Sequence, residues 1–253
     1  MAAGGSDPGP ALPSGPALSF GAAAAAYERG RPGYPDRAVD WLVPPGAGLV
    51  ADVGAGTGKL SRQLRERGLA VVAVEPLEQM RAELTRAVPG VPVLAGTAEE
   101  IPLPDASADA VLLAQALHWV DPQRAIPEAA RVLAPGGQLG LAWNVRDEQV
   151  GWVADLGRIM GSHGEPGRDR SPALGPPFQP PERLAVRWVA HLTPAALLDL
   201  VASRSYVITQ PPAGRERILT GVRRLLQTHP DLAGVSDIAL PYVTLCSRAR
   251  LAA

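Results

Sequence analysis

The stretch VADVGAGTGK, residues 50–59, decides the fold because it joins a short apolar run to a glycine-rich turn. Asp52 comes just before the turn, and glycine recurs at every second position, as Gly54, Gly56 and Gly58. A glycine-rich turn between a strand and a helix is a common ligand-binding element of open α/β sheets. The stretch therefore predicts a strand that ends in a binding loop, and its spacing bears on which ligand the loop holds.

Two phosphate-binding loops begin in a similar way, and the spacing argues against both. A mononucleotide P-loop needs GxxxxGK followed by Ser or Thr, but Leu60 follows Gly58-Lys59, and Val53 occupies the place of the first glycine. The dinucleotide fingerprint GxGxxG would require its third glycine at position 59, which is Lys59. Asp52 would repel a pyrophosphate, whereas it suits an ammonium or sulfonium group. An NAD(P)-dependent Rossmann oxidoreductase is therefore the disfavoured alternative.

Short apolar runs alternate with helical patterns along most of the chain. Strands are expected at residues 49–53, 70–74, 91–95, 108–114, 138–143, 184–191 and 238–248, and helices at 20–27, 36–42, 59–67, 77–88, 122–133, 195–203 and 215–228. Pro127 lies inside the helix expected from 122 and favours a later start, near Ile126. Unbroken apolar strands separated by helices indicate a parallel sheet in an α/β domain.

Two segments fall outside this alternation. Residues 1–19 consist of Gly, Pro, Ala and Ser with few other residues and a single charge, so they are expected to be disordered and to precede one domain over 20–253. Between positions 161 and 181, ten of 21 residues are Gly or Pro. The segment 147–183 is therefore expected to be a variable insertion that acts as a lid and shapes the acceptor pocket.

The composition excludes several classes of partner. Lys and Arg (24) nearly balance Asp and Glu (25), so neither a nucleic-acid backbone nor an anionic membrane is expected as a partner. No apolar run reaches the 18 residues of a membrane span, and the first nineteen residues lack the basic residues of a signal peptide. Cys246 is the single cysteine, and the four histidines are too scattered for a metal site. We expect a cytoplasmic protein, monomeric or homodimeric.

Glu75 is the second acidic residue with a suggestive position. It lies 17 residues past Gly58, at the end of the next expected strand. A carboxylate there accepts hydrogen bonds from both hydroxyls of an adenosine ribose. The alternative is a solvated carboxylate before Pro76, although its place one strand–helix unit after a glycine loop favours the ribose.

Five motifs in register extend this interpretation to a family. They are DVGAGTG (52–58), VEP (74–76), GTAEEIPLPDASADAV (96–111), AQALHWVDP (114–122) and VLAPGGQLGLAW (132–143). In this order the chain resembles class I S-adenosylmethionine-dependent methyltransferases, in particular the branch that contains the trans-aconitate and ubiquinone/menaquinone-biosynthesis enzymes. The resemblance covers roughly residues 20–147 and, more weakly, ALPYVTLCSRAR (239–250). It implies a Rossmann-like three-layer α/β sandwich with a seven-stranded sheet of order 3-2-1-4-5-7-6, in which only strand 7 is antiparallel.

The resemblance also implies which residues contact S-adenosylmethionine. The methionine part is expected at the glycine turn, through Asp52, Gly54, Ala55 and Gly56, and the N-terminal segment with Tyr27 and Arg31 is expected to close over the cofactor. Arg31 would pair with the methionine carboxylate or with an acidic acceptor, and the alternative is a surface arginine. The ribose would bind Glu75, the adenine would lie near Pro76, Thr97, Ala98 and Glu99, and the sulfonium would lie above Ala114 and Gln115. Many relatives have Asp in place of Thr97, so Thr97 is expected to contribute less. The turn APGG is expected to be structural, because glycine supplies its positive φ.

The implied reaction is methyl transfer to a small-molecule acceptor by in-line displacement. It needs positioning and sometimes a base, but no metal. His118, after the fourth strand, is the candidate base, and the alternative is a packing residue paired with Trp119. Asn144 and Arg146 are candidates for the acceptor pocket, and so is Trp143, which is equally compatible with the core. A non-methylating member of the fold that keeps the cofactor remains a further alternative.

Overall fold

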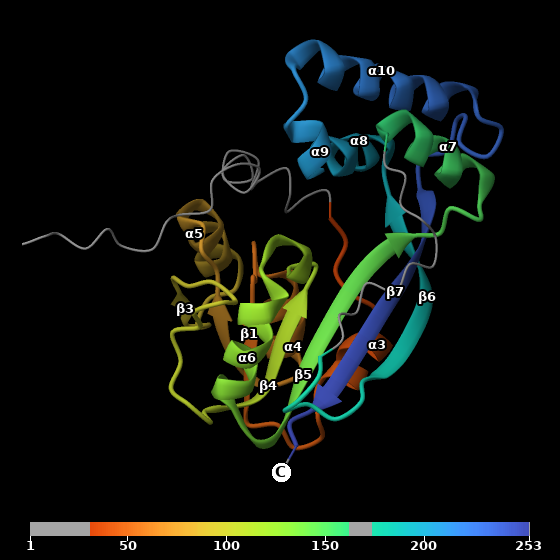
Figure 1. The fold of residues 1–253 in the computed structure, drawn as a ribbon. Helices are drawn as coiled ribbons and strands as arrows, with labels where there is room; N and C mark the ends of the chain where they lie inside the picture. Colours follow the sequence, from red (N-terminus) through yellow and green to blue (C-terminus); the bar gives the residue numbers. More distant parts are fainter. Residues whose placement is uncertain (1–30, 162–173, 253) are drawn as a thin grey trace, which may run out of the picture.

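One mixed sheet organises the part of the chain that the computed structural model describes, residues 31–161 and 174–252 (Figure 1). Its strands follow the order β3-β2-β1-β4-β5-β7-β6. Their bounds are β1 Leu49–Val53, β2 Ala70–Val74, β3 Val93–Leu94, β4 Ala108–Ala114, β5 Leu133–Arg146, β6 Glu182–Leu192 and β7 Ile238–Arg250. The strands from β1 to β5 are parallel, and β7 runs antiparallel to both β5 and β6. The expected strand order and the antiparallel strand 7 are confirmed.

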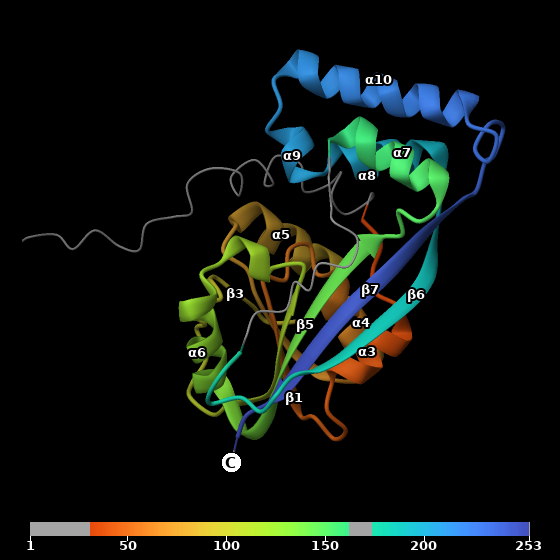
Figure 2. The same cartoon turned by 45° about the vertical axis from the view of Figure 1, so that its right-hand side comes forward.

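Helices cover both faces of this sheet, which makes the three layers (Figure 2). On one face, α3 (Asp36–Leu42), α4 (Lys59–Glu66) and α5 (Glu78–Ala87) share a buried core with Val50, Leu112 and Ala142 of the strands. On the other face, α6 (Pro122–Val132) packs against Val53 and Val111. Alternate residues of each strand enter opposite cores, as buried parallel strands require.

A helical cap forms a third core above the sheet. It consists of α7 (Gly151–Met160), α8 (Pro194–Ala202), the short α9 (Ser205–Ile208) and α10 (Pro212–Thr228). Its buried side chains include Leu156, Leu197 and Val222, and they pack around the ends of β6 and β7. In both ribbon views the cap lies beyond the carboxyl end of β5, so it faces the edge at which the parallel strands end (Figures 1 and 2).

Several expected boundaries differ in the structure. Helix α6 starts at Pro122 despite Pro127, because Asp121 caps it by accepting a hydrogen bond from Gln123 N (2.9 Å) and because Ile126 is buried. Strand β3 is shorter than expected, and β5 is longer at both ends. Helix α7 forms in the segment expected to be a variable insertion, because its apolar residues Trp152, Val153, Leu156 and Met160 follow a helical spacing and are buried. The expectations for 1–19 and for a helix at 20–27 concern residues outside those described.

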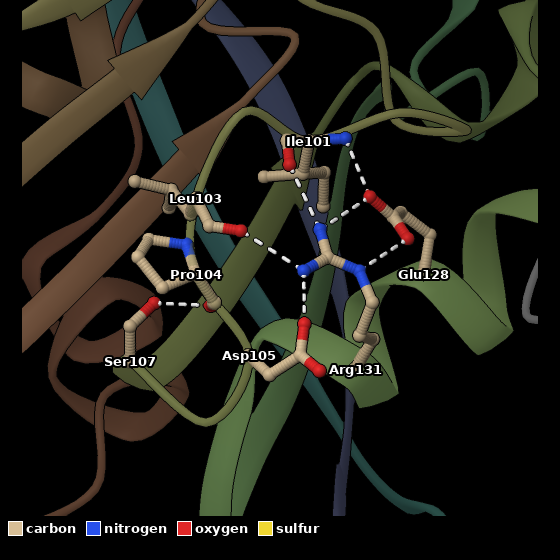
Figure 3. A network of polar contacts seen from close by, with 7 residues as sticks. All are labelled: Ile101, Leu103, Pro104, Asp105, Ser107, Glu128 and Arg131. Atoms are coloured by element: carbon tan, nitrogen blue, oxygen red, sulfur yellow. Dashed lines mark hydrogen bonds and ion pairs between the residues drawn. The ribbon is translucent and has the colours of Figure 1, made fainter.

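Arg131, in the last turn of α6, ties the loop before β4 to the helix (Figure 3). Its guanidinium makes five hydrogen bonds: two to the carboxylate of Glu128, two to the backbone carbonyls of Ile101 and Leu103, and one to Asp105 at 2.5 Å. Because a guanidinium has five N–H donors in a fixed plane, this set uses its full capacity. The pKa of Glu128 is lowered, chiefly by its hydrogen bonds with Arg131. The motif at 96–111 is thus held in place by a structural arginine.

Replacing Arg131 by Ala is expected to lower the free energy of unfolding by about 2 kcal/mol. Two partly buried backbone carbonyls and the carboxylate of Glu128 lose their hydrogen-bond donors in this variant. For a domain of this size that corresponds to a decrease in Tm of about 4–8 °C. Thermal unfolding followed by circular dichroism measures the change. Arg131→Lys should recover little of it, because an ammonium cannot reproduce the planar set of bonds. An unchanged Tm in Arg131→Ala would show that the network is dispensable.

Candidate functional site

A cavity lies at the carboxyl ends of β1, β4 and β5. The space between its walls, open solvent included, is about 550 Å³. The lining residues come from the N-terminal segment, the glycine turn, the ends of the strands and the cap: Arg31, Pro32, Tyr34, Asp52, Gly54, Ala55, Thr57, Lys59, Leu60, Ala114, Gln115, Asn144, Arg204 and Tyr242. In open α/β sheets, ligands bind at this edge, where the strand order reverses on either side of the first strand.

The glycine turn needs glycine for its backbone and for close packing. Gly54, Gly56 and Gly58 all have positive φ angles, of 71°, 58° and 89°. A Cβ atom on Gly54 would lie 2.6 Å from Cβ of Ala116, and one on Gly58 would lie 2.7 Å from Cγ of Leu84. The alternate glycines therefore let the chain turn sharply beside β4 and α5, and they leave Gly54 and Ala55 at the cavity.

Asp52 is a buried carboxylate at the entrance of this turn. It is 1 % exposed, and its Oδ2 accepts a hydrogen bond from Ser61 Oγ (2.6 Å) at the start of α4. Burial raises the pKa of Asp52 to about 6, and the charge of Glu75 adds to the increase, although hydrogen bonds from Ser61 oppose it. A cationic group in the cavity would favour the ionised form. Asp52 therefore fits a ligand with an ammonium group.

Glu75 is held behind the turn by two backbone amides. Its Oε2 accepts from Gly56 N and its Oε1 from Leu77 N, each at 2.9 Å. Burial raises its pKa, and the two amides oppose this increase. A carboxylate offers about four acceptor positions, so two remain for a pair of hydroxyls. Glu75 does not itself line the cavity, but it directly fixes the turn that does.

Ala114 and Gln115, expected below the sulfonium, also line the cavity. Gln115 has a positive φ of 58°, which is rare for a residue with a side chain. Its Nε2 donates to the carbonyl of Asn144 (3.0 Å), and this bond fixes its side chain against β5. Strain of this kind is maintained by surrounding bonds and is common at functional sites.

The expected adenine residues lie away from the cavity lining. Thr97 pairs with Glu100 in an isolated bridge, and Ala98 is buried in the core. Glu99 accepts a hydrogen bond from the backbone N of Asp121 (2.9 Å). The carbonyl of Pro76 accepts from Arg81 (2.6 Å). The structure thus gives these four residues local contacts, and their role toward adenine stays a prediction.

The segment at residues 31–34 is attached to the site by hydrogen bonds. Arg31 lines the cavity and donates to the carbonyl of Ser203 in the cap (3.4 Å). Asn144 Nδ2 donates to the carbonyl of Gly33 (2.8 Å), and Gln63 bonds both backbone groups of Tyr34. Arg31 and the glycine turn therefore line the same cavity, and the contact of Arg31 with a ligand stays a prediction. Tyr27 lies outside the described residues.

His118 lies on the short helix η1 (Leu117–Trp119), which follows β4. Its side chain is exposed, its ring centroid is 4.8 Å from that of Trp119, and it is not among the lining residues. Trp143 is 2 % exposed and belongs to the core, so the structure supports the core alternative for Trp143, which packs in the same core as α6. Asn144, one residue further along β5, points the other way and lines the cavity.

Arg204 and Tyr242 line the cavity from outside the segments that the sequence analysis assigned to the site. Arg204 lies between α8 and α9, and Tyr242 lies on β7, so both are far in sequence from the glycine turn. Tyr242 belongs to the weakly matched motif at 239–250, which was a usable signal, whereas Arg204 follows no recognisable pattern.

Comparison with known proteins identifies the family. The model of a methyltransferase domain matches residues 51–141. An uncharacterized methyltransferase of Mycobacterium tuberculosis is 60 % identical over 93 % of this chain and 96 % of its own length. The chain belongs to the class I methyltransferase family. A demethylmenaquinone methyltransferase of Renibacterium salmoninarum is 39 % identical over 37 % of this chain and 40 % of its own length. A solved structure of a candidate type II methyltransferase from Anaeromyxobacter dehalogenans has a TM-score of 0.58 and 29 % identity, and the match covers 88 % of this chain and 97 % of that one.

Residues 31–161 and 174–252 of this methyltransferase carry neither a membrane-spanning helix nor a cluster of metal-ligating side chains. Within them, no helix combines the length and apolar character needed to cross a bilayer. Nor does that part of the chain gather three His, Cys, Asp or Glu side chains into a candidate metal site.

The raised pKa of Asp52 predicts how S-adenosylhomocysteine binding depends on pH. Because the ammonium group of this ligand prefers ionised Asp52, and because Asp52 protonates as pH falls through about 6, affinity should fall below pH 6. Between pH 7.5 and pH 5 the dissociation constant should rise about tenfold. Isothermal titration calorimetry across this range measures it.

Asp52→Asn is the matched control, because the amide keeps an acceptor for Ser61 and removes the titrating group. It should bind weakly and with no dependence on pH between 5 and 7.5. A wild-type affinity that is constant over this range would contradict the role given to Asp52.

Proposed function

We propose that this methyltransferase transfers the methyl group of S-adenosylmethionine to a small-molecule acceptor. The observation that carries the proposal is the pairing of two buried carboxylates, Asp52 and Glu75, on either side of one glycine turn at the cavity. Together they match a ligand with an ammonium group at one end and a ribose further along. The family membership supports the same cofactor.

The residues of the chain would act mainly by positioning. Asp52 and Arg31 would bind the amino and carboxylate groups of the methionine part, and Glu75 would accept the ribose hydroxyls. When bound, the cofactor supplies an activated methyl group on a good leaving group, so the protein needs to orient the acceptor and exclude water. The cap above the cavity would exclude water. In-line placement of this kind accounts for roughly 7–11 kcal/mol of a barrier.

A small acceptor is supported by the shape of the site and by one relative. The cavity is lined by residues of the cap as well as of the sheet edge and is partly enclosed, which suits a small molecule. The Renibacterium salmoninarum relative is named for a demethylmenaquinone acceptor. The experiment that identifies the acceptor of this chain is incubation with methyl-labelled cofactor and a metabolite extract, followed by detection of the labelled product.

Glu75→Ala is expected to weaken S-adenosylhomocysteine binding by tenfold or more, on the order of the 1.5–3 kcal/mol of a charged hydrogen bond. Calorimetric titration measures the affinity, and circular dichroism checks that the variant is folded. Glu78→Ala, an exposed carboxylate at the start of α5, is the matched control and should bind as the wild type does. Equal affinity in the two variants would remove Glu75 from the ligand site.

Binding of NADH in place of S-adenosylhomocysteine by the wild type would favour an oxidoreductase.

His118→Ala is expected to slow methyl transfer to an oxygen or nitrogen acceptor by about 100-fold and to leave S-adenosylhomocysteine affinity unchanged. The rate is measured as label transferred to the acceptor found above, over pH 6–9. Trp119→Phe, which keeps an aromatic neighbour for His118, controls for loss of the ring contact. Full activity of His118→Ala at every pH would leave His118 as a packing residue.

A further inference from the structure

Charges are distributed unevenly along the cavity wall. Among the lining residues, Asp52 is the acidic one, and it lies at the glycine turn with a bond to Ser61. Three cations, Arg31, Lys59 and Arg204, line the same cavity. Lys59 begins α4 at the glycine turn, whereas Arg204 belongs to the cap and Arg31 bonds Ser203 there, so the wall near the cap is electropositive through the two arginines.

Arg204 is a partly buried cation between the helices α8 and α9. Its backbone N donates to the carbonyl of Val201 (3.1 Å), and its own carbonyl accepts from Val207 and Ile208 (2.9 Å each). The Nε atom of Arg204 is buried and has no hydrogen-bond partner among the described residues. Burial, followed by repulsion from Arg31, lowers the pKa of Arg204 to about 10, so it remains cationic near neutral pH.

Tyr242 presents a second buried donor to the same part of the cavity. It is 1 % exposed, and its hydroxyl also has no hydrogen-bond partner in the described part of the chain. Its ring stacks on Trp188 of β6 with centroids 5.2 Å apart, which fixes its direction. Across the sheet it pairs with Arg146 of β5, so these two side chains share one face. Arg146 and Tyr242 both contribute to the electrostatic environment of Arg204.

A buried guanidinium N–H and a buried phenol O–H without acceptors each carry a desolvation cost. Natural proteins satisfy most such groups, so a pair of them lining one cavity indicates a ligand that completes the bonds. The two donors match the two oxygens of a carboxylate, and the surrounding cations match its charge.

We infer that Arg204 and Tyr242 form a carboxylate-binding subsite, so that the methyl acceptor of this enzyme is a carboxylic acid. The identification of the ligand as a methyl acceptor rests on the proposed function, whereas the carboxylate-binding subsite rests on the two donors. Arg31, which bonds the carbonyl of Ser203 in the cap, is assigned to the carboxylate of the methionine part. The acid group would thus be anchored at the cap while the rest of the acceptor extends toward Gln115 and Asn144.

Acetate tests the subsite, because it is small enough to enter without knowledge of the whole acceptor. Acetate, acetamide and inorganic phosphate are titrated into the full chain saturated with S-adenosylhomocysteine, at constant ionic strength, and binding is followed by ligand-observed NMR. We expect acetate to bind, acetamide to bind at least tenfold more weakly, and phosphate to bind no better than acetate. Acetamide binding as well as acetate, or phosphate binding more tightly than acetate, would overturn the assignment of a carboxylate site.

Two variants assign the binding to the pair. Arg204→Met should weaken acetate binding by about tenfold or more, and Tyr242→Phe, which keeps the stack on Trp188, by about threefold or more. Arg224→Met, which removes an exposed arginine of the same cap, is the matched control and should bind acetate as the wild type does. Wild-type acetate affinity in both test variants would overturn the inference.

The affinity for S-adenosylhomocysteine separates this inference from the proposed function. Both variants should bind it within about twofold of the wild type, because the pair serves the acceptor. A large loss of that affinity in both would assign the pair to the carboxylate of the cofactor and overturn the inference, while the proposed function would stand. If the wild type itself binds no S-adenosylhomocysteine, the proposed function fails, and the acetate titration of the ligand-free chain still decides whether the subsite exists.

Discussion

The buried carboxylate of Asp52 is the constraint around which the site is built. The residue lies at the end of the central strand β1, where it pairs in register with Ala73 of β2 and Leu112 of β4, and Ser61 is its hydrogen-bonded neighbour. Since its pKa is raised from 3.8 to about 6, the folded protein holds the proton more tightly than the unfolded chain does. The contribution of Asp52 to the stability of the fold is therefore lost as pH rises from about 4 to 6. At neutral pH the ligand-free protein carries the ionised Asp52 carboxylate, which its buried surroundings disfavour. A ligand cation removes that cost, which couples binding to the state of one proton.

The turn after Asp52 transmits the same constraint to the neighbouring elements. Gly54 must pass close to Ala116 and Gly58 close to Leu84, so β4 and α5 are packed against the turn. Glu75 then accepts a bond from the backbone of Gly56, which joins the end of β2 to the turn. Asp52 and Glu75 are thus connected through the backbone of the glycine turn, and a change at either residue is expected to affect that backbone. This linkage explains why a loop of small residues can hold a ligand without large side chains of its own.

The sequence predicted the parallel half of the fold because its signals are local. Each strand from β1 to β5 is an apolar run beside a turn, and Asp52, Gly54 and Ala114 are placed by those runs at one sheet edge. The cap was harder to foresee, because α7 lies in a segment whose neighbours are rich in glycine and proline. Arg204 and Tyr242 reach the cavity only through the antiparallel pairing of β7 with β5 and the packing of α8 and α9. No spacing in the sequence connects these two residues to the glycine turn, which lies roughly 150 to 190 residues earlier. The periodicity of one segment does not predict contacts between distant segments.

The most direct test of this account is a crystal structure of the chain with S-adenosylhomocysteine. The account predicts that the amino group of the ligand lies within hydrogen-bond distance of the Asp52 carboxylate and that both ribose hydroxyls contact Glu75, with the glycine turn between them. A ligand bound elsewhere, or one whose ammonium and ribose avoid both carboxylates, would contradict it.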